Sequence, residues 1–130
     1  YKDSHVLSGD TIIDFNGEII GKPSSNNEAF KIIDKLSNKT HSVISGLSLF
    51  YNGKAITIFD KTDVTFKKLS KSIIKNYIKS FDVLDKAGAY NIEDAENILI
   101  KHIDGCYNNI VGFPLKKFKM SQIKTILDNL

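Results

Sequence analysis

The sheet is organised around a run rich in β-branched and aromatic residues, Thr40-His41-Ser42-Val43-Ile44-Ser45-Gly46-Leu47-Ser48-Leu49-Phe50-Tyr51, followed by Asn52-Gly53. An Asn-Gly pair between two such runs is the strongest short-range hairpin signal, because both residues adopt positive φ at low cost. A second run extends from about Ala55 to Phe66. The sequence therefore predicts a long antiparallel hairpin.

The residues before this hairpin predict a second hairpin and a helix. Residues 5–15 read as a largely buried strand, and Asn16-Gly17 turns it into the short run 18–20. Ser24 or Ser25 can cap the helix that follows, and Glu28 completes a capping box with Ser25. The apolar face of this helix has helical spacing and comprises Ala29, Ile32, Ile33 and Leu36.

The residues after the hairpin add two helices and a strand. Ser70 is expected to open a helix that ends near Ser80, and residues 81–95 are expected to form a loop. Residues 98–103 indicate another strand, and Pro114 suits the first turn of a final helix. The prediction is one α/β domain over residues 1–130, with a mixed β-sheet and flanking helices.

Composition narrows the classes of function. The chain has 130 residues, of which 42% are hydrophobic and 25% charged, as in an ordinary globular domain. No apolar run reaches the roughly 18 residues of a membrane span, so no membrane partner is expected. All 18 basic residues are lysine, with no dense basic stripe, so we expect no nucleic-acid partner. The single Cys106 suits a reducing compartment, and a cytoplasmic location is expected.

Three side chains on short elements are candidates for a phosphate site. Asp10 interrupts an apolar run, so its carboxylate should emerge at a strand's edge or end; capping a turn is the alternative. Lys22 lies between Gly21 and Pro23, where it can meet phosphates or remain a solvated loop lysine. Lys86 can face phosphate or hold its loop through Asp85. An acid with two lysines suits metal-assisted phosphate chemistry.

Seven segments in order resemble the Maf family of nucleoside triphosphate pyrophosphatases. They are Gly9-Asp10-Thr11, Asn16-Gly17-Glu18-Ile19-Ile20-Gly21-Lys22-Pro23, Leu36-Ser37, Thr40-His41, Thr62-Asp63-Val64-Thr65-Phe66, Leu84-Asp85-Lys86-Ala87-Gly88-Ala89-Tyr90 and Tyr107-Asn108-Asn109-Ile110-Val111-Gly112-Phe113-Pro114-Leu115. The resemblance implies a Maf/inosine triphosphate pyrophosphatase-like fold. It also implies N-terminal truncation, because the family's Ser-x-Ser-Pro-Arg-Arg phosphate loop has no counterpart in these residues. Loss of a strand would expose a sheet edge, and a homodimer is one expected consequence.

The resemblance implies hydrolysis of a nucleoside triphosphate to the monophosphate and pyrophosphate. Asp10 would be the catalytic carboxylate or the ligand of a divalent metal, Mg²⁺ or Mn²⁺, while Lys22 and Lys86 would contact phosphates. The alternative is a non-catalytic remnant that binds nucleotide weakly or pairs with another chain.

Two positions bear on which nucleobase is preferred, and they indicate different nucleobases. Glu93 stands where pyrimidine-preferring members have glutamine, and the branch that acts on 7-methyl-GTP resembles this chain in having glutamate there. A carboxylate only accepts hydrogen bonds, which suits the N–H edge of guanine. Thr11 and the segment around Lys86 resemble the pyrimidine branch instead. Both dTTP/UTP and a modified nucleotide therefore stay open as substrates.

Overall fold

The computed structural model describes residues 6–105 and 122–129. Its five strands form one sheet in the order β2-β1-β3-β4-β5. The strands are β1 (Val6–Phe15), β2 (Glu18–Ile20), β3 (Thr40–Tyr51), β4 (Lys54–Phe66) and β5 (Ile100–Asp104). All four pairings are antiparallel. The α/β class is confirmed, and the parallel pair that a mixed sheet requires is not found within the described ranges.

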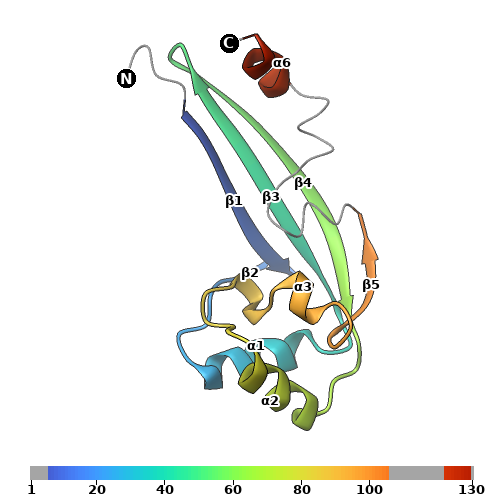
Figure 1. The fold of residues 1–130 in the computed structure, drawn as a ribbon. Coiled ribbons are helices and arrows are strands. Elements are labelled where there is room, and N and C mark those ends of the chain that lie inside the picture. The colour runs from blue at the N-terminus through green and yellow to red at the C-terminus, as the bar shows by residue number, and fades with distance from the viewer. Residues whose placement is uncertain (1–5, 106–121, 130) are drawn as a thin grey trace.

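Most of the described helices gather at one end of this sheet. These are α1 (Asn26–Leu36), α2 (Lys71–Ser80), the 3₁₀ turn η1 (Ala87–Ala89) and α3 (Ile92–Ala95), whereas α6 (Gln122–Asp128) lies at the other end. Figure 1 shows α1, α2 and α3 clustered below the sheet, whereas β1, β3 and β4 extend well beyond them and α6 lies near the β3–β4 turn. Among the helices that the structure describes, none combines the length and apolar character needed to cross a membrane.

Local sequence signals account for the turns and the helix starts. Asn16 and Asn52 have φ values of 53° and 48°, and both are followed by a glycine at positive φ, so the two hairpins are confirmed. The Ser25 hydroxyl accepts the backbone N–H of Glu28 at 3.2 Å, and the Ser70 hydroxyl caps α2 in the same way. The Glu28 carboxylate accepts a hydrogen bond from the Ser24 hydroxyl.

The apolar core has two parts on the same face of the sheet. The larger part joins the strand residues Ile13, Val43 and Phe66 to Ile33 of α1 and Ile74 of α2. The smaller part lies at the distal end, where β3 packs against α6; its members are Leu47, Leu49, Ile123 and the partly buried Tyr51, Ile56, Ile58, Ile126 and Leu127. Between these two clusters, the described part of β3 contributes the buried polar residue Ser45.

Three predictions need correction. The first half of β1 is not buried: Val6 and Leu7 are 51% and 47% exposed, because α1 and α2 cover only the end of the strand that carries Ile13. The predicted loop 81–95 contains η1 and α3, which are too short to produce helical periodicity. The last strand begins at Ile100 rather than at residue 98. The predicted helix start at Pro114 lies outside the described residues.

Candidate functional site

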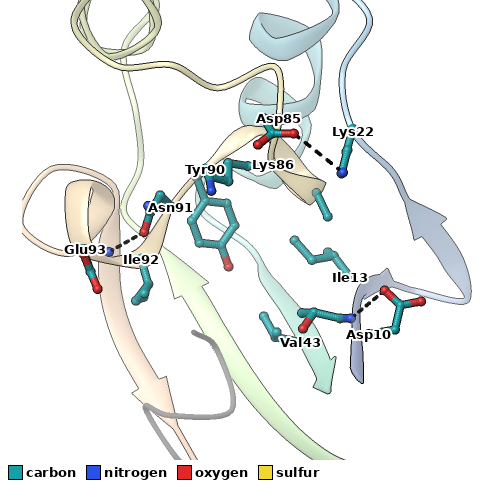
Figure 2. Close-up of a pocket in the computed structure, with 12 residues that line it drawn as sticks. Asp10, Ile13, Lys22, Val43, Asp85, Lys86, Tyr90, Asn91, Ile92 and Glu93 are labelled. Carbon is teal, nitrogen blue, oxygen red and sulfur yellow. Dashed lines mark hydrogen bonds and ion pairs between the residues drawn. The ribbon is translucent and has the colours of Figure 1, made fainter. Parts of the chain in front are cut away.

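A cavity of about 450 Å³ opens where β1 passes beneath the segment 85–93. Its walls come from β1, β3, the loop after β2, η1 and α3. The lining residues are Asp10, Thr11, Ile13, Lys22, Val43, Asp85, Lys86, Ala87, Tyr90, Asn91, Ile92 and Glu93. Figure 2 shows Asp10 and Lys22 on one side of the cavity and Asn91, Ile92 and Glu93 on the other. All five residues that the sequence singled out are therefore brought to one site.

Asp10 and Thr11 form the wall contributed by β1. Asp10 pairs with Gly46 in the middle of the strand, not at its end, and β3 is the only described strand that pairs with this part of β1. Successive strand residues point to opposite faces, so Thr11 shares the core face with Ile13. The Asp10 carboxylate instead lies along the outer edge of β1, where Oδ1 accepts the backbone N–H of Thr11 at 2.8 Å.

Thr11 is tied to the neighbouring strand. Its Oγ1 lies 3.1 Å from Oγ of Ser45, which is fully buried on β3. This contact holds the Thr11 hydroxyl at the cavity, half-buried, in a fixed direction. Sequence reasoning did not single out Ser45, because the partner across a strand pair becomes visible only once the register is known.

The opposite wall depends on a glycine with a left-handed backbone. Gly88 has a φ of 71°, and a Cβ at this position would lie 2.3 Å from Cδ1 of Ile13. Its backbone N–H donates to the carbonyl oxygen of Gly21 at 3.1 Å. This bond brings the loop that carries Lys22 beside the segment that carries Lys86. A residue without a Cβ therefore suits this position, where the backbone turns tightly beside Ile13.

The two lysines differ in their surroundings. Lys22 Nζ lies 3.8 Å from Oδ1 of Asp85, and both side chains are mostly exposed. An exposed ion pair of this length contributes little to stability, so a phosphate group can replace Asp85 as the partner of Lys22. Lys86 is half-buried at the cavity wall. The sequence left open a link between Lys86 and Asp85, but the ion pair in the structure joins Asp85 to Lys22.

Glu93 lies across the cavity from Asp10 (Figure 2). It is exposed in the first turn of α3, and its backbone N–H donates to Oδ1 of Asn91, the N-cap residue, at 3.1 Å. The Asn91 side chain thus fixes the backbone of Glu93 and leaves the carboxylate at the cavity. Asn91 and Ile92 line the same wall, although sequence reasoning did not single them out.

Tyr90 packs into the apolar core. It is only 6% exposed, and its hydroxyl lies 2.7 Å from Nε2 of the buried His41. Burial raises the pKa of the Tyr90 hydroxyl well above its ordinary value, so the phenol is neutral. Burial also lowers the pKa of His41 to about 4, although the charge of Asp63 opposes the shift. Both groups are therefore uncharged near neutral pH.

The carboxylates around the cavity do not form a metal cage. Within residues 6–105 and 122–129, no three His, Cys, Asp or Glu side chains come together as metal ligands. Magnesium is commonly bound by only one or two carboxylates together with substrate phosphates, and it keeps several waters. Asp10, exposed at the cavity, fits that mode of binding.

The fold places this chain in the α/β class, with an antiparallel sheet covered by helices at one end. The cavity is lined by acids and lysines, which are the residue types that contact charged small molecules. The sequence model of one family, described as Maf-like protein, matches residues 1–122, and the chain belongs to this family.

Curated relatives agree with this assignment. A dTTP/UTP pyrophosphatase of Thermosipho africanus is 41% identical over 116 residues, which cover 89% of this chain and 61% of that protein. Proteins of the same name from Bacillus cereus and Pyrococcus abyssi are each 39% identical, and the matches cover 62% of each. The chain thus spans about three-fifths of the length of these relatives.

Proposed function

We propose that this chain contributes the catalytic pocket of a nucleoside triphosphate pyrophosphatase that converts dTTP or UTP to the monophosphate and pyrophosphate. The observation that carries the proposal is the convergence of Asp10, Thr11, Lys22, Lys86 and Glu93 on one cavity from four separate segments. The names of the relatives, dTTP/UTP pyrophosphatases, support both the reaction and the substrates.

In the proposed reaction, water attacks the α-phosphorus of the nucleotide. An oxygen–phosphorus bond forms to the α-phosphate, and the bond between the α-phosphorus and the bridging oxygen breaks, so that pyrophosphate leaves. Asp10 accepts the proton of the attacking water as general base. The ammonium groups of Lys22 and Lys86 stabilise the negative charge that develops on the departing phosphates.

We further propose that Asp10 holds a divalent cation, Mg²⁺ or Mn²⁺, together with the phosphates. Such an ion supplies Lewis-acid stabilisation of phosphate oxygens, which is the usual contribution of Mg²⁺ in phosphoryl chemistry. Hard oxygen ligands favour these two ions over softer metals. The two proposed roles of Asp10 can be tested separately. If Asp10 is a metal ligand, the affinity for the metal depends on its carboxylate, whereas a general base alone leaves that affinity unchanged.

The base is proposed to lie between Thr11 and Glu93. Thr11 presents a hydroxyl that can donate to a pyrimidine carbonyl or accept from the ring N–H beside it, and Ser45 keeps it oriented. Glu93 presents an acceptor across the cavity, which suits a base with N–H groups on its edge. We place dTTP and UTP first because of the relatives, and a modified guanine nucleotide is the outcome to test against them.

The test is pyrophosphate release by the purified chain, with dTTP, UTP, dCTP, GTP and 7-methyl-GTP, each with and without Mg²⁺. The Thermosipho africanus relative serves as positive control. A chimera joins the chain to the portion of that relative that the chain does not match. Release of pyrophosphate by the chain or by the chimera, lost on Asp10→Asn, supports the proposal. A folded chimera that binds no nucleotide would falsify it.

A second function is a nucleotide-binding chain without catalysis. The coverage of about three-fifths of each relative favours testing it, because catalytic groups of those proteins can lie in the unmatched portion. Calorimetric binding of dTTP with no hydrolysis by either the chain or the chimera supports this second function. A cytoplasmic protein without nucleic-acid partners is proposed in both cases.

A homodimer is proposed through the outer edge of β1. Residues 6–12 pair with β3 alone among the described strands, and the exposed Val6 and Leu7 lie on this segment. Sedimentation equilibrium of the wild type and of Leu7→Lys tests the proposal. A monomeric wild type at micromolar concentration contradicts it.

A further inference from the structure

A buried polar pair lies directly behind the cavity. Nε2 of His41 and the hydroxyl oxygen of Tyr90 are 2.7 Å apart, and the two residues are only 2% and 6% exposed. Phe66 completes the cluster with edge-on ring contacts, 5.0 Å from His41 and 5.1 Å from Tyr90 between centroids. Such a bond in a low-dielectric core is costly to break, because either group then loses its partner away from water.

This pair connects the sheet to the segment that carries two proposed substrate contacts. His41 belongs to β3, and Tyr90 ends the run from Asp85 that includes Lys86 and precedes Glu93. Three other polar contacts hold this segment, and each differs from the bond between His41 and Tyr90. The backbone bond from Gly88 to Gly21 joins it to a loop rather than to a strand, and the Lys22–Asp85 ion pair is exposed.

The third of these contacts is a long hydrogen bond. The backbone N–H of Asn91 reaches the hydroxyl of Tyr77 only at 3.4 Å. Among these four polar contacts, the hydrogen bond between His41 and Tyr90 is therefore the short, buried one that joins the segment to the sheet. The sheet in turn carries Asp10 and Thr11, so this bond, together with the packing of Ala89 and Ile92 in the apolar core, holds one wall of the cavity against the other.

We propose that His41 is a positioning residue, which acts through Tyr90 to hold the segment 85–93 at the spacing from β1 that nucleotide binding requires. His41 does not line the cavity and is not a catalytic residue. The effect on nucleotide binding rests on the proposed function, whereas the placement of segment 85–93 by the bond between His41 and Tyr90 does not. The imidazole acts as a neutral hydrogen-bonding group, and the remaining ring nitrogen, Nδ1, has no partner among the described residues.

The neutral imidazole suggests a matched pair of variants. The amide of glutamine reaches about as far from the backbone as Nε2 of histidine, whereas the amide of asparagine is one methylene shorter. His41→Gln should therefore keep the bond to Tyr90, and His41→Asn should lose it while retaining the same chemical group. Tyr90→Phe removes the other partner, and Tyr51→Phe on the distal part of β3 is the control for loss of a tyrosine hydroxyl.

The structural readout is amide hydrogen exchange of the nucleotide-free chain, followed by NMR. We expect Tyr90→Phe and His41→Asn to speed exchange of Gly88 and Ala89 by about fivefold or more relative to the amides of α1, the scale of one hydrogen bond. His41→Gln and Tyr51→Phe should leave that ratio unchanged. Equal acceleration throughout the chain, or no difference between His41→Asn and His41→Gln, overturns the proposal.

The functional readout is calorimetric binding of dTTP in a double-mutant cycle. If His41 positions Lys86, then Lys86→Ala weakens binding in the wild type but has at least about threefold less effect in Tyr90→Phe. Additive effects overturn positioning, because a role in packing alone lowers stability without changing the contribution of Lys86. The cycle is made in the chain or in the chimera, whichever binds dTTP. Should neither bind dTTP, the proposed function fails, while the exchange experiment still decides the structural part.

Discussion

The backbone N–H of Gly88 donates a hydrogen bond to the carbonyl oxygen of Gly21, at 3.1 Å. This bond joins two loops that are far apart in the sequence, and each loop carries a lysine of the cavity. Lys22 follows Gly21 directly, and Lys86 precedes Gly88 by two residues. A backbone contact that accompanies the positive φ of Gly88 thus brings two lysines of the cavity lining onto neighbouring loops.

This backbone conformation gives a stability prediction for Gly88→Ala. The new Cβ would be 2.3 Å from Cδ1 of Ile13, so this side chain, buried at 3% exposure, would have to shift. We expect the free energy of unfolding to fall by about 3 kcal/mol, from left-handed strain together with overpacking. Gly53→Ala is the matched control, because Gly53 has a φ of 76° but open space around its Cβ position. Urea unfolding of both variants measures the difference, and equal losses would show that the contact with Ile13 is unimportant.

Asp10→Asn should abolish pyrophosphate release while preserving the fold. The side chain is exposed, and an asparagine Oδ1 can still accept the N–H of Thr11. Loss of a positioned proton acceptor predicts a decrease in kcat of at least about a hundredfold. Asp60→Asn is the control, since Oδ1 of Asp60 accepts the next backbone N–H in the same way, at 2.9 Å, outside the cavity lining. Near-normal turnover by Asp10→Asn would remove this residue from the mechanism.

Glu93→Gln should move the substrate preference toward dTTP and UTP. The amide adds a donor that a pyrimidine carbonyl can accept, whereas the carboxylate offers acceptors alone. We expect the ratio of kcat/KM for UTP over GTP to rise by about tenfold, since Glu93 is exposed and a single hydrogen bond contributes about 1 kcal/mol net. Glu96→Gln at the C-cap of α3 makes the same chemical change outside the cavity lining. If both variants leave the ratios across the nucleotide panel unchanged, Glu93 does not contact the base.

Stability should increase with pH between about 4 and 6.5 because of His41. Burial lowers the pKa of this imidazole from 6.5 to about 4, so the unfolded chain binds the proton more readily in this interval. The contribution is complete above pH 6.5 and is lost as the pH falls toward 4. A shift of this size corresponds to roughly 3 kcal/mol.

The measurement is urea unfolding at several pH values, taken as the difference between wild type and His41→Gln. Glu28, whose pKa is lowered by its hydrogen bond with Ser24, is present in both proteins, so its contribution cancels in this difference. The wild type should lose stability relative to the variant as the pH falls. A difference that stays constant from pH 7 to pH 4 would contradict a buried neutral histidine.

Several features of this protein follow from short-range sequence signals. The Asn-Gly turns at Asn16 and Asn52 and the caps at Ser25 and Ser70 are confirmed where they were predicted. Each depends on one or two neighbouring residues whose preferred φ or side-chain hydrogen bond is nearly independent of the rest of the chain. α3 escaped prediction because four residues cannot show a helical period, although its N-cap, Asn91, carried a recognisable signal.

The site itself has a mixed origin. Asp10, Thr11, Lys22, Lys86 and Glu93 were chosen from residue type and motif, and the structure brings all of them to one cavity. Residue type could not reveal Ser45 behind Thr11 or His41 behind Tyr90, because both pairings arise from strand register and from packing across the sheet.

In β1, likewise, the strand conformation follows from the local sequence, whereas burial depends on the tertiary structure. Its apolar residues and its strand conformation are encoded locally, and the strand forms as predicted. Which half of the strand is covered depends on where α1 and α2 pack, so Ile13 is buried whereas Val6 and Leu7 are exposed. Secondary structure is thus set by interactions between near neighbours, which the sequence records directly. Burial, register and the meeting of distant side chains depend on long-range packing, whose free energy is realised only when the whole chain has folded.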